Sequence, residues 1–253
     1  MSSIHSLKDK VALIIGGTGG IGAASAKLFA EAGATVIVTY RAGAKGEAAA
    51  AELLKGLPGQ GHFAQAADVI DTASLVALRD AVQARFGKLH VLVNTAGFTK
   101  PVAHGDLDAL DDELIDRMFA VNWRGQFAAI RSFAPLLKAS GDGVIVSISS
   151  IAGATGNGSS IAYCAVKAGI DVMTKSLARV LAPEVRVLGV APGVVDTGFV
   201  PGRGAEFNAK TAATTPLKRV ASAEDVAAAV LACCTHLTFS TGTTLVVDGG
   251  RSL

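Results

Sequence analysis

Short apolar runs alternate with longer stretches of helical spacing along the whole of this 253-residue chain. The apolar runs have the length and the β-branched content of buried strands. Alternation of this kind is typical of βαβ units, which build a parallel sheet with helices on both faces. We expect strands at Val11–Ile15, Thr35–Thr39, His62–Ala66 (the weakest pattern), Leu89–Val93, Val144–Ile148, Val185–Val190 and Thr244–Val247.

The stretches between these runs carry apolar residues three or four positions apart. We expect helices at Ile21–Ala32, Gly46–Leu54, Thr72–Phe86, Leu110–Phe119, Gly125–Lys138, Ile161–Leu181 and Ala223–Cys233, with a shorter one around Ala205–Ala212. No linker, repeat or low-complexity tract interrupts the pattern, so residues 1–253 are predicted to form one doubly wound α/β domain. Ligands of such sheets bind beyond the carboxyl ends of the strands, so the loops there should carry the site.

Composition argues against several classes of protein. The net charge of +2 is spread along the chain without a basic block, so we expect no nucleic-acid partner. The three cysteines (Cys164, Cys233 and Cys234) have neither a disulfide framework nor metal-ligand spacing, which favours a reducing cytoplasm and no metal. Residues 1–10 lack an apolar signal core, and no run reaches the ~18 apolar residues of a membrane span.

A glycine-rich loop follows the first predicted strand and precedes a predicted helix. Glycines allow a tight turn and a close approach of the backbone to a pyrophosphate, while the helix N-terminus favours its negative charge. The spacing Gly16-x-x-x-Gly20-x-Gly22 departs from the strict Gly-x-Gly-x-x-Gly pattern. Its position still favours a Rossmann-like nucleotide site over a structural turn. We expect the loop contacts to come from Gly16, Thr18, Gly19, Gly20, Ile21 and Gly22.

The end of the second predicted strand bears on which nucleotide is bound. Sites that prefer NAD usually carry an acid there, which accepts hydrogen bonds from the adenosine ribose. This chain has Tyr40 and Arg41 instead. A guanidinium matches a 2′-phosphate in charge and geometry, so we expect NADP(H) rather than NAD(H).

Tyr163 and Lys167 lie four positions apart in a predicted helix, so their side chains share one face. An ammonium near a phenol favours the phenolate and should lower the tyrosine pKa from about 10, which makes the group usable as an acid or base. Taken alone, the pair is better explained as ordinary helix packing. Other motifs of the chain change that balance.

From about Lys8 to Leu253 the chain resembles the short-chain dehydrogenase/reductase family. The glycine loop is similar to the family's first motif, and Ser150 precedes Tyr163 by the usual thirteen residues. Asn122 stands where the family has its catalytic asparagine. Thr95 replaces the second asparagine of the family's Asn-Asn-Ala-Gly motif. By this resemblance, further cofactor contacts are expected from Asp68, Val69, Asn94, Ala96, Gly97, Pro192, Gly193, Val195 and Thr197, besides Tyr163 and Lys167.

The resemblance also implies a mechanism. The nicotinamide exchanges hydride with a carbonyl carbon, and Tyr163 gives the substrate oxygen its proton. Ser150 hydrogen-bonds the same oxygen, and Lys167 lowers the Tyr163 pKa and binds the nicotinamide ribose. Asn122 holds a water that connects Lys167 to solvent. Family members of this kind are usually tetramers, so we expect a homotetramer or a homodimer.

Plainer interpretations stand beside these roles. Ser150 could cap a turn, Asn94 could bond its own backbone, and Asn122 could bond a helix carbonyl. A protein that binds a dinucleotide as a regulator or scaffold, without turnover, is the alternative from another functional class. That class has no need of the serine, the tyrosine and the lysine together, so we favour the enzyme.

The substrate is left open by the sequence. Residues 196–218 form a glycine- and proline-punctuated segment of the kind that often covers a site. Phe98, His104, Trp123 and Ile151 are candidate pocket residues, and each is equally suited to packing. The resemblance is greatest to bacterial 3-oxoacyl-carrier-protein reductases, so a 3-oxoacyl thioester is one candidate substrate among other carbonyl compounds.

Overall fold

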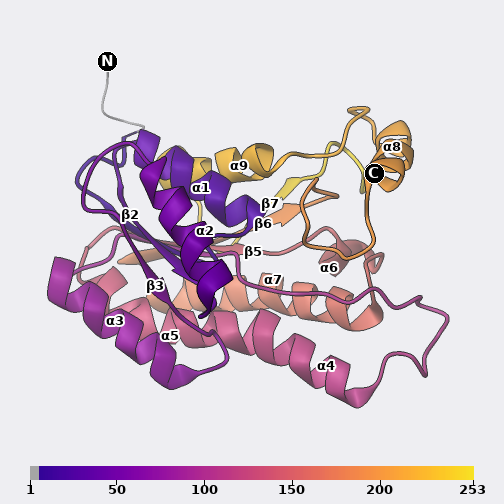
Figure 1. Ribbon diagram of the computed structural model, residues 1–253, viewed down its shortest axis with the longest axis horizontal. Helices are drawn as coiled ribbons and strands as arrows, with labels where there is room; N and C mark the ends of the chain where they lie inside the picture. Colours follow the sequence, from indigo (N-terminus) through magenta and orange to yellow (C-terminus); the bar gives the residue numbers. More distant parts are fainter. Residues whose placement is uncertain (1–5) are drawn as a thin grey trace.

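Seven parallel strands form one sheet at the centre of the computed structural model, which describes residues 6–253 (Figure 1). Residues 1–5, on which part of the argument against a signal segment rests, lie outside the described residues. The strands are β1 Val11–Ile15, β2 Thr35–Tyr40, β3 Phe63–Ala66, β4 Val91–Asn94, β5 Gly143–Ile148, β6 Val185–Pro192 and β7 Thr244–Val247. The predicted parallel sheet is confirmed.

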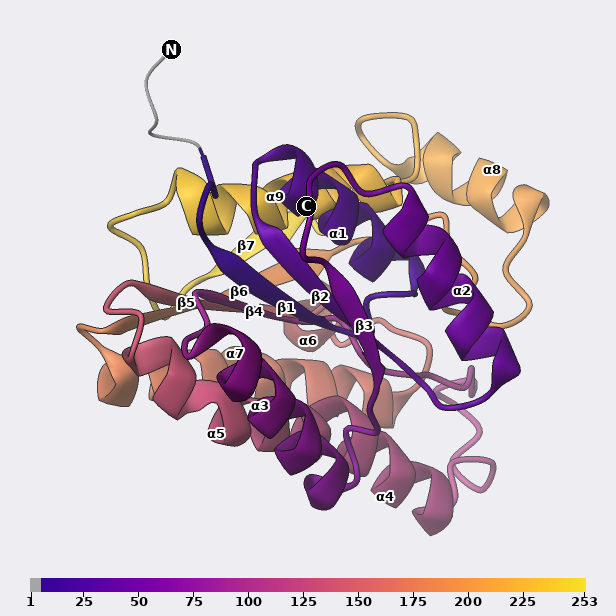
Figure 2. The same cartoon turned by 60° about the vertical axis from the view of Figure 1, so that its left-hand side comes forward.

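Helices cover both faces of this sheet, as the alternating pattern predicts (Figure 2). Helices α1, α2 and α9 lie on one face, and α3, α5 and α7 lie on the other, with α4 beside α7. Their bounds are α1 Gly20–Glu31, α2 Ala44–Lys55, α3 Thr72–Phe86, α4 Asp112–Phe119, α5 Gly125–Lys138, α6 Ala152–Thr155, α7 Ile161–Leu181, α8 Ala205–Thr214 and α9 Ala223–Thr235. No helix within residues 6–253 is both long and apolar enough to cross a membrane.

The strand order is β3-β2-β1-β4-β5-β6-β7, so the direction of winding reverses between β1 and β4. A crevice forms at such a reversal, and ligands of open α/β sheets bind there. The register brings Ile15 of β1 beside Asn94 of β4, and Asn94 beside Ser147 of β5. The loops that follow these three strands therefore leave the sheet at the same level.

Two apolar cores hold the helices to the sheet. One packs Leu75, Leu78 and Phe133 from α3 and α5 against β1, β4 and β5, and the other packs Phe29 and Val230 from α1 and α9 against the opposite face. At most a few percent of the surface of each of these side chains is exposed to solvent. Both faces of β1 and β4 are therefore shielded from solvent, which explains their continuous apolar runs.

Most predicted boundaries hold within two or three residues, and the differences have local causes. Strand β4 starts at Val91 rather than Leu89, because the Leu89 amide donates to the carbonyl of Leu136 in α5 instead of to a neighbouring strand. A five-residue π-helix, η2 Ala120–Arg124, joins α4 to α5, and the sequence did not indicate it. Helix α6 is also additional to the predicted set.

Candidate active site

A cavity of about 1230 Å³ opens along the carboxyl edge of the sheet. Its walls come from the glycine loop and from the loops that follow β2 to β6. Among the predicted site residues, those that line it are Gly16, Thr18, Gly19, Gly20, Ile21, Gly22, Tyr40, Arg41, Asp68, Val69, Ala96, Gly97, Ser150, Tyr163, Lys167, Pro192, Gly193, Val195 and Thr197. Asn94 and Asn122 do not line it.

The glycine loop is shaped by close backbone contacts. Gly16 has φ +78°, which disfavours any residue with a Cβ, and a Cβ on Gly22 would collide with the Gly16 carbonyl oxygen. A Cβ on Gly17 would lie 2.6 Å from the Val38 Cβ. No side chain caps the start of α1 at Gly19. The backbone amides of the first helical turn therefore face the cavity without a side-chain partner. The loop therefore has the form of an anion cradle.

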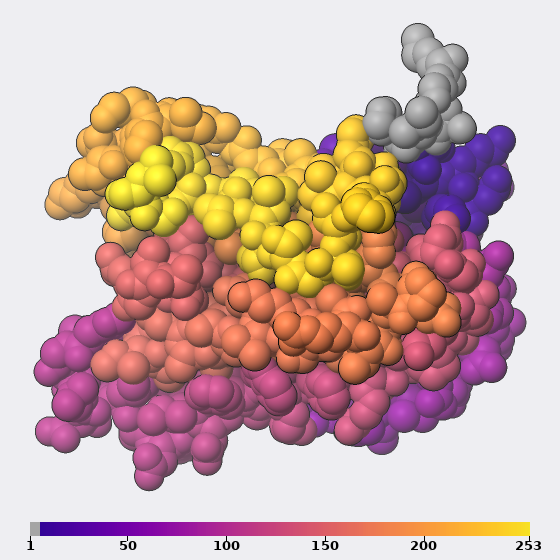
Figure 3. Space-filling model, turned by 180° about the vertical axis from the view of Figure 1, so that it is seen from behind, coloured from indigo at the N-terminus to yellow at the C-terminus, as the bar shows by residue number. Residues whose placement is uncertain are grey.

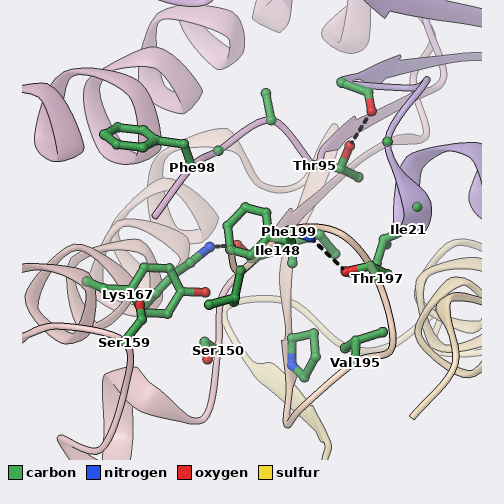
Figure 4. Close-up of a pocket in the computed structure, with 18 of the residues that line it drawn as sticks. Ile21, Thr95, Phe98, Ile148, Ser150, Ser159, Lys167, Val195, Thr197 and Phe199 are labelled. Atoms are coloured by element: carbon green, nitrogen blue, oxygen red, sulfur yellow. Dashed lines mark hydrogen bonds between the residues drawn. The ribbon is translucent and has the colours of Figure 1, made fainter. Parts of the chain in front are cut away.

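Thr95 braces this loop from the neighbouring strand end. Its hydroxyl lies 2.7 Å from the carbonyl oxygen of Ile15 and 3.1 Å from that of Gly16, and it donates to this pair (Figure 4). The Gly16 amide in turn donates to the Thr39 hydroxyl at 2.9 Å. The sequence marked Thr95 only as a departure from the family's asparagine, and its bracing role could not be read from one chain.

Asn94 lies inside the sheet rather than on the cavity wall. It is fully buried, and its amide nitrogen donates to the Ser147 hydroxyl at 3.4 Å. Its amide oxygen has no partner among the described residues. Asn94 is therefore not among the cavity-lining residues, whereas Ala96 and Gly97, two and three residues later, are, and its predicted cofactor contact stays a prediction.

The end of β2 presents an exposed Arg41 to the cavity, next to Tyr40. The only carboxylate on the cavity wall, within residues 6–253, is Asp68 after β3. An Asp68 carboxylate oxygen already accepts the Ile70 amide at 3.0 Å, which shapes its own turn. The acid on the wall thus follows β3, and the end of β2 contributes Tyr40 and Arg41.

Ser150, Tyr163 and Lys167 all line the cavity. Figure 4 shows Ser150 and Lys167 among its lining residues. The Ser160 hydroxyl caps α7 by accepting the Tyr163 amide at 3.1 Å, which sets where the tyrosine enters the helix. The Ser150 hydroxyl accepts the Ala152 amide at 3.2 Å, and its interaction with the phenol lowers the pKa of Tyr163. Lys167 donates from Nζ to the Ile148 carbonyl oxygen at 2.7 Å, and Nζ lies 5.5 Å from the centre of the Tyr163 ring.

Burial controls the proton affinities of this group. It raises the Tyr163 pKa to about 12, against the opposing effects of the Ser150 hydrogen bond and the Arg203 charge. It lowers the Lys167 pKa to about 8, although Asp171 acts in the other direction. The expected depression of the tyrosine pKa is therefore corrected: burial raises the Tyr163 pKa, and the Lys167 ammonium donates to the Ile148 carbonyl oxygen.

Asn122 is buried in the π-helix η2 and has no free side-chain atom. Its amide oxygen accepts the Phe98 amide at 3.1 Å, and its nitrogen donates to the carbonyl oxygens of Phe98 at 3.0 Å and Met118 at 2.9 Å. A Cβ on Gly97 would lie 2.5 Å from the Asn122 oxygen. The side chain thus fixes the Gly97–Phe98 segment of the cavity wall, and its role in holding a water stays a prediction.

The remaining wall comes from the loop after β6 and from the segment 196–218. Thr197 packs on the glycine loop, since a Cβ on Gly20 would lie 2.7 Å from its methyl carbon. Phe98, Ile151 and Phe199 give this end of the cavity apolar surface. His104 and Trp123, the other candidate pocket residues, are not on the wall. Trp123 instead donates its indole N–H to the Gly169 carbonyl at 3.1 Å.

Comparisons with known proteins agree with this geometry. The model of a protein family described as "Enoyl-(Acyl carrier protein) reductase" matches residues 16–252. A solved short-chain type dehydrogenase/reductase from Mycobacterium ulcerans is similar, with a TM-score of 0.89 and 30% identity over 98% of this chain and 91% of that one. The chain belongs to the short-chain dehydrogenase/reductase family.

Two further relatives describe the chemistry found within the family. The cis-4-hydroxycyclohexanecarboxylate dehydrogenase of Sinomonas cyclohexanicum is 38% identical, over 97% of this chain and 98% of the relative. A 3-ketoacyl-(acyl-carrier-protein) reductase from Brucella melitensis, solved in complex with NADH, has a TM-score of 0.86 and 32% identity over 98% of this chain and 100% of that one. This short-chain dehydrogenase/reductase is accordingly an oxidoreductase that acts on the alcohol or carbonyl group of a small molecule with a nicotinamide dinucleotide.

Proposed function

We propose that this protein is an NADP(H)-dependent carbonyl reductase, which converts a ketone into a secondary alcohol and can run in reverse. The observation that carries this proposal is the convergence of Ser150, Tyr163 and Lys167 on one cavity beside an uncapped glycine loop. The whole chain acts as one dinucleotide-binding and catalytic domain, in which residues 196–218 form the cover of the substrate end.

The residues of the cavity fit a dinucleotide. The glycine loop and the first turn of α1 would hold the pyrophosphate, and Asp68 and Val69 would lie beside the adenine. Arg41 would pair with a 2′-phosphate, and no carboxylate stands at the end of β2 to repel it. Lys167 would reach the nicotinamide ribose, and Pro192, Gly193, Val195 and Thr197 would border the nicotinamide.

The side chains supply the proton chemistry. When bound, the nicotinamide supplies the hydride for reduction. Tyr163 keeps its proton at neutral pH, which lies far below its pKa of about 12, so it can give that proton to the developing alkoxide. Ser150 hydrogen-bonds the same substrate oxygen and orients it. Lys167 places a positive charge near the phenol, and Asn122 positions the Gly97–Phe98 wall.

Two substrate classes are compatible with this chemistry. Similarity to a 3-ketoacyl-(acyl-carrier-protein) reductase supports a 3-oxoacyl thioester. Similarity to a hydroxycyclohexanecarboxylate dehydrogenase supports a compact ring alcohol or ketone. The alternative from another class is a dinucleotide-binding regulator without turnover, which the presence of all three reacting side chains disfavours.

A panel of ketones and 3-oxoacyl thioesters, followed by the decrease in NADPH fluorescence, tests this function. We expect turnover of at least one member, with NADPH preferred to NADH. If the protein binds NADPH tightly and transfers hydride to no carbonyl compound of a broad panel, the regulator is favoured instead.

We also propose a homotetramer, or a homodimer, in a reducing compartment such as the cytoplasm. An apolar groove between α5 and α7 is lined by Phe127, Ile130, Leu177 and Leu181. Val246 of the edge strand β7 is 53% exposed, in the C-terminal segment that lies across the rear of the molecule (Figure 3). Such apolar surface favours burial against a second copy.

A further inference from the structure

Arg203 is a half-buried arginine on the cavity wall whose charge has no acidic partner among the described residues. It lies in the loop between β6 and α8, with its guanidinium carbon 4.5 Å above the ring of Phe207. No ion pair or side-chain hydrogen bond of Arg203 to another described residue is found. A guanidinium removed from water is stabilised by an oxyanion, and it has five N–H donors to offer.

The acids near Arg203 in the chain are already engaged elsewhere. Glu206 pairs with Lys210 at 2.8 Å, and Asp196 accepts a hydrogen bond from Asn208 at 2.8 Å. The only carboxylate on the cavity wall, among residues 6–253, is Asp68 after β3, which belongs to the cofactor end. The protein therefore leaves the Arg203 guanidinium available to a ligand in the cavity.

Two other arginines face the same end of the cavity but are less suited to that task. Arg251 uses its guanidinium to hold the C-terminal end of α8, donating to the Thr214 hydroxyl at 3.1 Å and to the Thr211 carbonyl at 3.4 Å. Arg117 is exposed and lies 5.1 Å from the ring of Phe98. Of the three, Arg203 combines partial burial with donors that are not in use.

Arg203 also lies within electrostatic reach of the reacting phenol, since its charge lowers the pKa of Tyr163. The apolar rings of Phe199 and Phe207 adjoin the two polar groups: Phe199 is 6.3 Å from the Tyr163 ring, and Phe207 lies under the guanidinium. A ligand with an apolar body could place its oxygen at Tyr163 and its negative charge at Arg203.

We propose that Arg203 binds the carboxylate of the substrate, and that the substrates of this protein are oxo acids and the corresponding hydroxy acids. This inference rests on the proposed carbonyl reduction at Tyr163 and adds the second point of attachment. A guanidinium and a carboxylate form two parallel hydrogen bonds, which fix the orientation of the acid as well as its position. An uncharged ketone of the same shape lacks this attachment.

Binding and turnover of matched ligands test the proposal. Cyclohexanecarboxylate and its uncharged amide are titrated calorimetrically into the protein saturated with NADP⁺, and 4-oxocyclohexanecarboxylate and its amide are compared as substrates with NADPH. We expect the acid to bind at least about tenfold more tightly than the amide, and the oxo acid to have the lower KM by a similar factor. Arg203→Gln should abolish both differences and leave the Kd of cyclohexanecarboxamide within about twofold. Lys210→Gln, which removes an exposed charge from α8, should keep both differences.

The outcomes separate this inference from the proposed reaction. Equal binding of acid and amide by the unchanged protein, or a preference for the acid that survives Arg203→Gln, overturns the role of Arg203. An equal fall in kcat for acid and amide substrates would also overturn it. That result would mean that Arg203 acts on the Tyr163 phenol or on the structure of its loop, and not on the substrate carboxylate. Tight, Arg203-dependent binding of the acid without any turnover would retain the anion site and reject the reductase.

Discussion

Arg41 is the residue we expect to choose between the two dinucleotides. Replacing it by alanine should raise the Kd of NADPH by about 10- to 100-fold, because a charged, bidentate hydrogen bond to the 2′-phosphate is lost. The Kd of NADH should change less than about twofold. Fluorescence titration of both cofactors measures this, with Lys55→Ala as the control, since Lys55 is an exposed cation of α2 outside the cavity. An equal rise in the Kd of both cofactors would show that Arg41 does not select between them.

The proton affinity of Lys167 makes reduction depend on pH. Lys167 is charged below its lowered pKa of about 8 and neutral above it, while Tyr163, with a pKa of about 12, stays protonated through this range. If the ammonium assists the phenol, kcat/KM for ketone reduction should be constant below about pH 8 and fall at higher pH, by up to about tenfold per pH unit. Initial rates at saturating NADPH measure the profile. A flat profile up to about pH 10, with the fold intact by circular dichroism, would contradict this role.

The residue types at the site could be predicted from the sequence, and their local environments could not. The four-residue spacing placed Tyr163 and Lys167 on one helix face, and both do line the cavity. The predicted direction of the tyrosine pKa was wrong, because burial raises this pKa, and the Lys167 ammonium donates to the Ile148 carbonyl oxygen. Neither follows from the identity of neighbours along the chain.

The end of β4 supports the glycine loop through a single hydroxyl. Thr95 donates to the Ile15 and Gly16 carbonyl oxygens, so Thr95→Val, which keeps the shape, leaves both without this donor. We expect the free energy of unfolding to fall by about 1 kcal/mol and the Kd of NADPH to rise several-fold. Thermal or urea unfolding and cofactor titration measure these effects. Thr95→Ser, which retains the hydroxyl, should behave like the unchanged protein, and a serine variant as impaired as the valine variant would contradict the brace.

Elements with strong periodicity were predictable, whereas those shaped by tertiary contacts were not. Helices α3, α5 and α7 have the predicted bounds because apolar spacing and local caps such as Asp71 and Ser160 define them. The π-helix η2 escaped prediction, since it places Asn122 against the Phe98 backbone and has no sequence pattern of its own. The sequence pattern predicted only the two ordinary helices on either side of it, α4 and α5.

At the scale of the whole molecule, exposed apolar surface predicts assembly. Val172 and Val180 of α7 are 61% and 67% exposed, and the β7 edge adds Leu245 and Val246. We expect light scattering coupled to size exclusion to give four times the 25.5 kDa of one chain, or twice that mass for a dimer. Val246→Lys should lower the mass if β7 lies in an interface. A monomer at micromolar concentration would contradict the proposed assembly.

The central claim is that Tyr163 gives and takes the proton at the substrate oxygen. Tyr163→Phe removes only the hydroxyl and keeps the ring packed near Phe199. The kcat for the best carbonyl substrate, measured with NADPH, is the most direct test. Our account predicts a fall of about 10²- to 10⁴-fold with NADPH binding unchanged within about twofold. Full turnover by the phenylalanine variant would contradict it.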